Sequence, residues 1–191
     1  MMAGMYTRAV APVVATIALF CFGLSVAREA RAPGFDAAHP PRAGDEGVFF
    51  GPLVRVKDGD SLVAKVQGVA MNFRLAEIDA PELDQPYGRA AKQELVALVS
   101  GQQLVIVPLD TDRYGRTVAQ VWTGTTHVNA ELVKRGAAWF YSEFARSPEL
   151  YEVEQEARDA KRGLWALQLQ DRIEPWEWRK RAARRRVHPY P

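Results

Sequence analysis

The strongest constraint on the fold of this chain is an alternation of apolar and polar residues between about 48 and 128. Alternation with a period of two is typical of strands with one buried face. It recurs in short stretches separated by turn-forming pairs such as Asp58-Gly59 and Gln67-Gly68. The expected strands are residues 53–56, 61–66, 70–75, 103–107 and 117–122, with a shorter one near 126–128.

Apolar residues at helical spacing are inserted between these strands and follow them. Residues 87–100 are expected to form a helix that ends before Gly101, residues 129–136 a shorter one, and residues 147–163 a third. The order of elements predicts an α+β domain, a small closed barrel with about three helices. An oligonucleotide-binding barrel is one of several architectures that this pattern allows.

The N-terminal part has the features of an export segment. Residues 9–27 are uncharged and mostly apolar, follow Arg8, and end in the small residues that a signal peptidase accepts. We expect residues 1–27 to be a cleaved signal peptide or, since this stretch nearly matches the ~20 residues that span a bilayer, an uncleaved membrane anchor. Both interpretations place the domain outside the cytoplasm, as a secreted, periplasmic or membrane-tethered protein. Residues 28–47 mix Pro, Gly, Ala and charge without a period, which predicts a flexible linker.

Charge is nearly balanced over the chain but gathers at its end. There are 25 Lys and Arg against 23 Asp and Glu, and the last sixteen residues hold six of the basic side chains and one acidic side chain. This balance excludes a protein that binds nucleic acid through overall positive charge, so such a partner must meet a local patch. We assign residues 48–178 to the domain and 179–191 to a basic tail. That tail either adds phosphate contacts or is a solvated end.

The acidic and arginine residues between 58 and 116 form a set suited to phosphate-ester chemistry. The one cysteine and the three scattered histidines exclude a Cys-based zinc site and disfavour a His-built one. A hard divalent cation prefers oxygen ligands, a water nucleophile needs a base, and phosphoryl oxygens are bound well by the planar guanidinium. Each element alone has an ordinary explanation as a turn or a solvated charge. The order and spacing of the whole set favour a catalytic site.

That order resembles the staphylococcal nuclease (thermonuclease) family. The matching stretches are residues 56–61 (VKDGDS), 73–82 (FRLAEIDAPE), 112–116 (DRYGR), 128–136 (VNAELVKRG) and 160–165 (AKRGLW). The resemblance covers about residues 49–165. It implies a five-stranded oligonucleotide-binding (OB-fold) barrel with helices, and Ca²⁺-dependent endonuclease activity on DNA and RNA.

The resemblance also implies a role for each matching residue. Asp60 and Asp79 match the metal carboxylates, and Ala80 falls where a backbone carbonyl completes the protein ligands. Glu82 matches the general base that activates water, and Arg74 and Arg116 match the arginines that stabilise the phosphoryl transition state. Arg113 and Tyr114 fall where a terminal phosphate of the substrate is held. Asp58 lies beside the metal site, where it would orient bound water.

Further expectations concern the aromatic residues and the partners. The family's base-stacking tyrosines fall near residues 142–144, where this chain has Ser142, Glu143 and Phe144, and Phe144 could stack on a base. Trp176 and Trp178 are expected to fold back onto the barrel as apolar anchors.

We expect a monomer that binds DNA and RNA substrates, with residues 9–27 as the candidate membrane tether. The competing class is a non-catalytic OB-fold module that binds single-stranded nucleic acid, which has no chemical need for the base, the carboxylates and both arginines together.

Overall fold

The barrel is built from five long strands, three of which bury four consecutive residues each. The computed structural model describes residues 41–144, 147 and 149–187, all of which belong to one compact unit of the chain. Within these residues the strands are β1 (Phe49–Val56), β2 (Ser61–Val66), β3 (Val69–Leu75), β4 (Ile78–Asp79), β5 (Gln103–Thr111), β6 (Thr117–Thr123), β7 (Thr126–His127) and β8 (Trp139–Phe140). The helices are α1 (Gly88–Val99), α2 (Val128–Lys134), α3 (Glu149–Asp159) and α4 (Pro175–Val187), with short 3₁₀ turns at Ser142–Phe144, Gly163–Ala166 and Leu169–Asp171.

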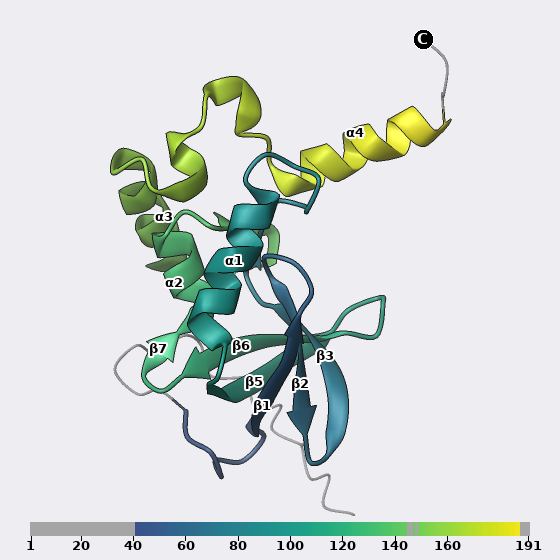
Figure 1. The fold of residues 1–191 in the computed structure, drawn as a ribbon, viewed down its shortest axis with the longest axis vertical. Helices are drawn as coiled ribbons and strands as arrows, with labels where there is room; N and C mark the ends of the chain where they lie inside the picture. Colours follow the sequence, from purple (N-terminus) through teal and green to yellow (C-terminus); the bar gives the residue numbers. More distant parts are fainter. Residues whose placement is uncertain (1–40, 145–146, 148, 188–191) are drawn as a thin grey trace, which may run out of the picture. The chain divides into compact units, whose positions relative to one another are not determined.

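Closure of the sheet is what makes these strands a barrel. The strand order is β3-β2-β1-β5-β6-β7, and β3 also pairs in parallel with β6. β1 pairs with β2 through residues 53–56 and with β5 through residues 49–52, so it is shared between both halves of the barrel (Figure 1). Its register shifts by one residue between Leu53 and Arg55, and such a bulge bends a strand. The predicted α+β fold with a five-stranded OB-type barrel is confirmed.

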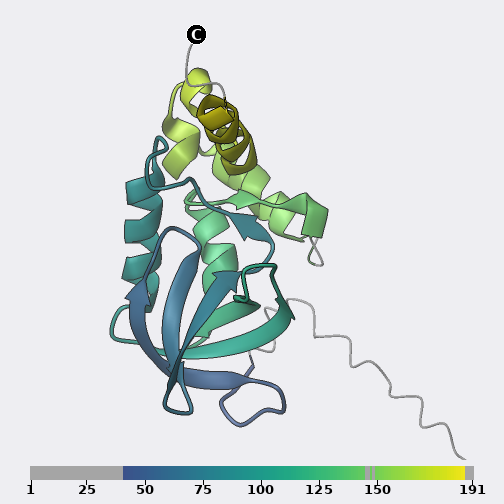
Figure 2. The same ribbon diagram turned by 90° about the vertical axis from the view of Figure 1, so that its right-hand side faces the viewer.

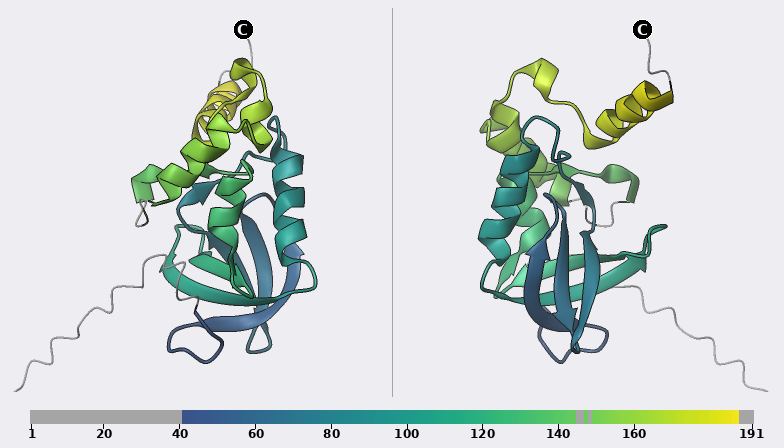
Figure 3. Two further views of the ribbon diagram at one scale, coloured as in Figure 1. Left: turned by 90° about the vertical axis from the view of Figure 1, so that its left-hand side faces the viewer. Right: turned by 45° about the vertical axis from the view of Figure 1, so that its right-hand side comes forward.

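The core lies between the barrel and the helices. Phe73 and Leu75 from β3, Ile106 from β5 and Leu95 from α1 are fully buried in one cluster. α2 lies between α1 and α3 (Figure 3) and contributes the buried Leu132 to the same cluster. Burial of apolar surface of this kind is the main stabilising contribution to such a domain.

Two glycines fix how the ends of α2 and α3 meet. Gly136 and Gly163 both have positive φ, 66° and 56°, and the Leu164 amide donates to the Gly136 carbonyl at 2.9 Å. A Cβ on Gly136 would lie 2.2 Å from the Arg162 carbonyl oxygen, and one on Gly163 would lie 2.3 Å from that of Gly136. These positions therefore need glycine for space as well as for conformation. A second cluster of Trp139, Ala157, Leu164 and Trp165 packs beside this contact.

The C-terminal helix α4 differs from the expectation of a basic tail after residue 178. It begins at Pro175, a residue favoured in the first turn of a helix, and runs across the expected boundary to Val187. With α4, the described residues contain four α-helices, where the sequence predicts about three. Trp176 does fold back, although onto Trp139 and Tyr141 and not onto the barrel wall. Figure 2, in which α4 is seen nearly end-on, shows it on the helical side of the barrel.

The remaining predictions about the N-terminal region fall outside this part of the chain. Residues 1–40, with the expected signal peptide or anchor and most of the linker, lie outside the described residues. Among the residues described, no helix combines the length and the apolar character needed to cross a membrane.

Candidate active site

The turn from Asp58 to Asp60 joins β1 to β2 and brings the first carboxylates into the site. The Asp58 carboxylate accepts a hydrogen bond from the Asp60 amide at 3.2 Å, which holds the turn. A Cβ on Gly59 would lie 2.6 Å from the Cβ of Ala80, so this close approach requires glycine. The approach lets the Ala80 amide donate to Asp60 Oδ2 at 2.7 Å. The turn and the loop after β4 are thereby joined.

Asp79 and Asp60 are held together by a single arginine. Asp79 is placed by the short ladder between β4 and β8, in which it pairs with Trp139, and its side chain is 1% exposed. Arg74 on β3 donates from Nη2 to Asp79 Oδ1 at 2.9 Å, and its Nη1 lies 3.0 Å from Asp60 Oδ2. Nη1 also donates to two backbone carbonyls. The structure therefore gives Arg74 a definite role as the link between the two predicted metal carboxylates.

Burial dominates the electrostatics of Asp60. The pKa of Asp60 is raised to about 7, mainly by burial and also by the Asp58 and Asp79 carboxylates, against the lowering effect of Arg74 and of the Ala80 amide. Carboxylates that share a site without enough positive charge behave in this way. Further positive charge near Asp60 would therefore favour its ionised form.

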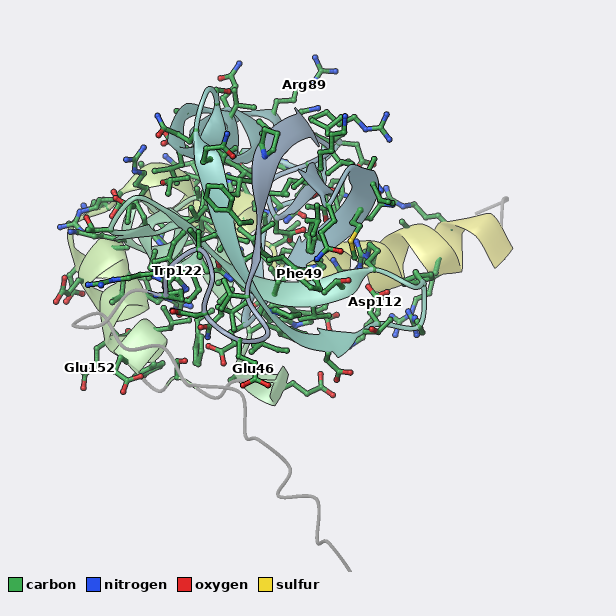
Figure 4. All side chains as sticks on the ribbon, turned by 90° about the horizontal axis from the view of Figure 1, so that it is seen from below. Glu46, Phe49, Arg89, Asp112, Trp122 and Glu152 are labelled. Atoms are coloured by element: carbon green, nitrogen blue, oxygen red, sulfur yellow. The ribbon has the colours of Figure 1, made fainter. Side chains whose placement is uncertain are left out.

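The β5–β6 hairpin tip carries the second predicted arginine. Arg116 donates from Nε to Asp112 Oδ2 at 2.7 Å, and its Nη1 lies 3.3 Å from the Ser61 hydroxyl at the start of β2. Burial acts to raise the pKa of Asp112, but hydrogen bonds from the Arg116 and Tyr114 amides and from the Arg116 side chain outweigh it and lower the pKa. Tyr114 is 70% exposed, with the Arg113 guanidinium 4.8 Å from its ring centre. Figure 4 labels Asp112 on the side of the barrel toward which α4 extends.

Glu82 follows Pro81 in the loop after β4 and is more accessible than Asp60 and Asp79. Its side chain is 37% exposed, and Oε1 accepts a hydrogen bond from Arg179 Nη1 at 2.8 Å. Arg179 also donates from Nη2 to Asp79 Oδ2 at 2.7 Å and lies within 3.2 Å of Asp79 Oδ1. Burial acts to lower the pKa of Arg179, but the hydrogen bonds to Asp79 and Glu82 raise it above its usual range.

The sequence patterns do not predict Arg179 as a site residue. It lies in the first turns of α4, about a hundred residues from its partners along the chain. The signals available were Pro175 and Glu177, which fit the first turn of a helix, within a stretch rich in Ala and Arg. These signals could have extended the domain beyond residue 178, but no local pattern indicates which basic residue reaches the carboxylates.

All eight predicted site residues line one cleft of about 1080 Å³, although they come from three separate stretches of the chain. The predicted residues in its wall are Asp60, Arg74, Asp79, Ala80, Glu82, Arg113, Tyr114 and Arg116, and Arg179 joins them. Asp58 lies in the same wall, as expected from its place beside Asp60. Tyr141 also lines this cleft, with its ring stacked on Trp176 at 5.2 Å between centres.

The aromatic residues near position 140 divide between core and cleft. Trp139 is 6% exposed and packs on Trp165, which fits a role in the core. Tyr141 is half-buried and lines the cleft. Among the described residues, Tyr114 is the other aromatic residue in the cleft wall. The predicted stacking residue Phe144 has a side chain that lies outside the described part of the structure.

The donor atoms at Asp60 and Asp79 fit a hard divalent cation. Both side chains offer carboxylate oxygens, share the Arg74 guanidinium and face the same cleft. In residues 41–144, 147 and 149–187, no three Asp, Glu, His or Cys side chains converge as a metal-binding group. A Ca²⁺ ion takes six to eight oxygen ligands, so one bound here would need backbone carbonyls and water besides these two carboxylates.

Comparison with known proteins relates this chain to one family. The family model described as "Staphylococcal nuclease homologue" matches residues 72–167. A protein named "Protein ParB" from Escherichia coli is 38% identical over 147 residues, which cover 71% of this chain and 82% of that protein. An "Uncharacterized endonuclease" from Escherichia coli O157:H7 is 40% identical over 134 residues, covering 70% and 86%. A "Micrococcal nuclease" from Shigella flexneri is 37% identical over 143 residues, covering 69% and 81%.

Proposed function

The chain belongs to the staphylococcal nuclease homologue family, and from that premise we propose that it is a nuclease that hydrolyses phosphodiester bonds in DNA and RNA. The proposal includes dependence on Ca²⁺ and internal cleavage of the substrate. Support comes from relatives named as nucleases and from the composition of the cleft. The observation that carries it is that Asp60, Asp79, Glu82 and Arg116 line one open cleft although three separate segments supply them.

In this proposal Glu82 acts as the general base. Its carboxylate is accessible in the cleft and close enough to Asp79 for one guanidinium to bridge the two. Glu82 would take a proton from water as the water oxygen forms a bond to phosphorus, and the bond from phosphorus to the leaving oxygen would break. The leaving oxygen would then take a proton from solvent. Positioned bases of this kind contribute roughly 10²–10⁴ to the rate.

The arginines would stabilise the negative charge that develops on the phosphoryl oxygens. Arg116 lines the cleft and is held by Asp112 through its Nε and by the Ser61 hydroxyl through its Nη1. Arg74 is 16% exposed and already bridges Asp60 and Asp79, so in our proposal it combines positioning of these carboxylates with a contact to the phosphate. Arg113 and Tyr114, on the exposed hairpin tip, would hold a terminal phosphate of the substrate.

Asp60, Asp79 and the Ala80 carbonyl would hold the Ca²⁺ ion. A divalent cation bound there would supply positive charge to a phosphoryl oxygen. The oxygen-only donor set favours Ca²⁺ or Mg²⁺ over zinc, which fits the absence of a Cys- or His-rich group among the described residues.

The place of action is a further proposal. The apolar residues 9–27 support export of the domain, which would act as a secreted or periplasmic enzyme or from a membrane tether. We propose a monomer. Edman sequencing of protein exported from expressing cells tests export, because a mature N-terminus soon after residue 27 indicates cleavage and an intact one indicates an anchor.

Incubation of the purified domain with DNA and with RNA tests the activity directly. We expect cleavage of both in Ca²⁺, loss of cleavage when a chelator is in excess, and recovery when Ca²⁺ is restored. Asp79→Asn should abolish cleavage, whereas Asp159→Asn, an exposed carboxylate on α3, should not affect it. Tight binding of single strands without any cleavage would instead indicate the non-catalytic binding module. Undiminished cleavage in chelator would overturn the assignment of Ca²⁺.

A further inference from the structure

Arg179 makes the most extensive contact with the acidic side of the cleft. Its two terminal nitrogens contact both oxygens of Asp79, at 2.7 and 3.2 Å, and one of them also contacts Glu82 at 2.8 Å. Asp79 is 1% exposed, so its carboxylate is satisfied almost entirely by Arg74 and Arg179. A single residue of α4 thus connects the proposed metal carboxylate to the proposed base.

The first turns of α4 are anchored, which fixes the position of the Arg179 backbone. Trp176 stacks on Tyr141 and packs edge-on against Trp139, with ring centres 5.2 and 6.2 Å apart. Trp178 donates from Nε1 to Asp84 at 3.2 Å, and Gln85 donates to the Ile173 carbonyl just before the helix. Arg179 is therefore held over the cleft by specific contacts on both sides.

A divalent cation and the Arg179 guanidinium need the same oxygens. Ca²⁺ binds carboxylate oxygens at about 2.3–2.6 Å, closer than the nitrogens of Arg179 now lie. Two cations on the Asp79 oxygens would repel one another at short range in a partly buried site. Of the two arginines on Asp79, Arg179 is the one that can leave, because it is 46% exposed whereas Arg74 is 16% exposed and bonded to backbone carbonyls.

We propose that Arg179 is a positioning residue of this site that holds Asp79 and Glu82 together in the metal-free protein and must release Asp79 before a divalent cation binds. Arg179 thereby sets the affinity of the site for the cation. The inference rests on the proposed function for the position of the cation, and it assigns a role to α4 that lies outside the barrel and its catalytic loops. Released from Asp79, Arg179 stays in the same cleft wall, within reach of Glu82.

Calcium titration of the full chain by calorimetry, without nucleic acid, tests this competition. The apparent dissociation constant is the intrinsic one divided by the fraction of protein that is competent to bind. If Arg179 occupies Asp79 in about nine tenths of the metal-free molecules, Arg179→Gln should bind Ca²⁺ about tenfold more tightly. Arg179→Lys keeps the charge but loses the planar fork, so its affinity should lie between those of Arg179→Gln and the unmodified protein.

Lys180→Gln is the matched control, since it removes one positive charge from the next position of the same helix. Lys180 pairs with Glu177 and is 61% exposed, so its removal should leave Ca²⁺ affinity within about twofold. An equal gain in Lys180→Gln would mean that net charge alone acts, and this would overturn the proposal. Unchanged or weaker Ca²⁺ binding in Arg179→Gln would overturn it as well, as would absence of Ca²⁺ binding in every variant.

A second measurement follows Arg179 itself in the unmodified protein. The guanidinium N–H signals of Arg179 in a ¹⁵N-labelled sample, identified by their loss in Arg179→Gln, should exchange slowly without metal. They should broaden or disappear on addition of Ca²⁺, whereas signals that persist at saturating Ca²⁺ contradict the release. A nuclease assay run in parallel separates the two proposals. If the protein cleaves nucleic acid and its Ca²⁺ affinity equals that of Arg179→Gln, only the role of Arg179 is rejected. No cleavage, with Ca²⁺ affinity raised in Arg179→Gln, rejects only the proposed function.

Discussion

The Asp112 carboxylate holds Arg116 at both its backbone and its side chain. Oδ1 accepts from the Arg116 amide at 2.9 Å, and Oδ2 accepts from Arg116 Nε at 2.7 Å. The same Oδ1 accepts from the Tyr114 amide, so the whole hairpin tip is organised around one side chain. The direction of the Arg116 fork is therefore fixed before any substrate arrives, and such preorganisation is what transition-state stabilisation requires.

Replacing Arg116 with lysine tests the planar fork separately from the charge. Arg116→Lys keeps a cation but cannot keep the Nε contact to Asp112 while it also presents paired donors. We expect the turnover number for DNA to fall by roughly 10²–10³, as when one preorganised donor is lost. Steady-state kinetics with a fluorogenic oligonucleotide measures this. Normal turnover in Arg116→Lys would show that positive charge alone is needed there.

Replacing Glu82 with glutamine tests the base. Glu82→Gln keeps the shape and a hydrogen-bond acceptor for Arg179, but it cannot take a proton from water. We expect turnover to fall by roughly 10²–10⁴ with little change in substrate affinity. Single-turnover kinetics and equilibrium binding of the same oligonucleotide separate the two effects. If only binding weakens, Glu82 acts on the substrate and not on water.

The buried His127 is expected to make the stability of the fold depend on pH. It is 7% exposed, its ring packs on Trp122 with centres 4.5 Å apart, and burial lowers its pKa to about 3. The unfolded chain protonates this residue near pH 6.5, so below that pH the unfolded state binds more protons and the free energy of unfolding falls as pH falls. The loss should continue down to about pH 3, where the folded state also becomes protonated.

We expect this effect to reach about 1.4 kcal/mol per pH unit from the one group. Urea unfolding of the unmodified protein and of His127→Gln between pH 7 and 4 measures it, because the difference between the two pH profiles removes the contribution of the carboxylates. Parallel profiles would mean that His127 titrates normally in the folded state.

The outer arginines of α4 test whether this helix contacts nucleic acid. Arg181, Arg184 and Arg185 are exposed, and Figure 1 shows the far end of α4 extending away from the barrel. If each binds a phosphate, changing all three to Gln should lower the salt dependence of duplex binding by about 0.9 per contact on the logarithmic scale. Changing the exposed Arg55, Lys65 and Lys134 on other elements is the matched control. Equal salt slopes in both triple variants would make the far part of α4 a solvated end.

The local patterns of this sequence determined most of the barrel. The strands predicted at residues 61–66 and 117–122 correspond closely to β2 and β6, although each of these two strands buries four consecutive residues and not every second one. Gly136 follows the end of α2 as expected, since a positive φ there suits glycine, whereas α3 already ends at Asp159 and Gly163 begins a short 3₁₀ turn. The resemblance of residues 58–116 to the staphylococcal nuclease family also identified the acids and arginines that the structure brings into one cleft.

Tertiary structure alone decided how these side chains meet. Asp79 is aligned by pairing of β4 with β8, strands of two residues each that are too short to show a period. Asn129 is fully buried and joins the Val121 amide to the Ala76 and Ala119 carbonyls, a link between β6 and the end of β3 that only the closed barrel makes possible. Arg179 reaches Asp79 because Trp176 anchors α4 on the helical cluster. Contacts between residues so far apart in the chain depend on how whole elements pack, and no local sequence pattern predicts that packing.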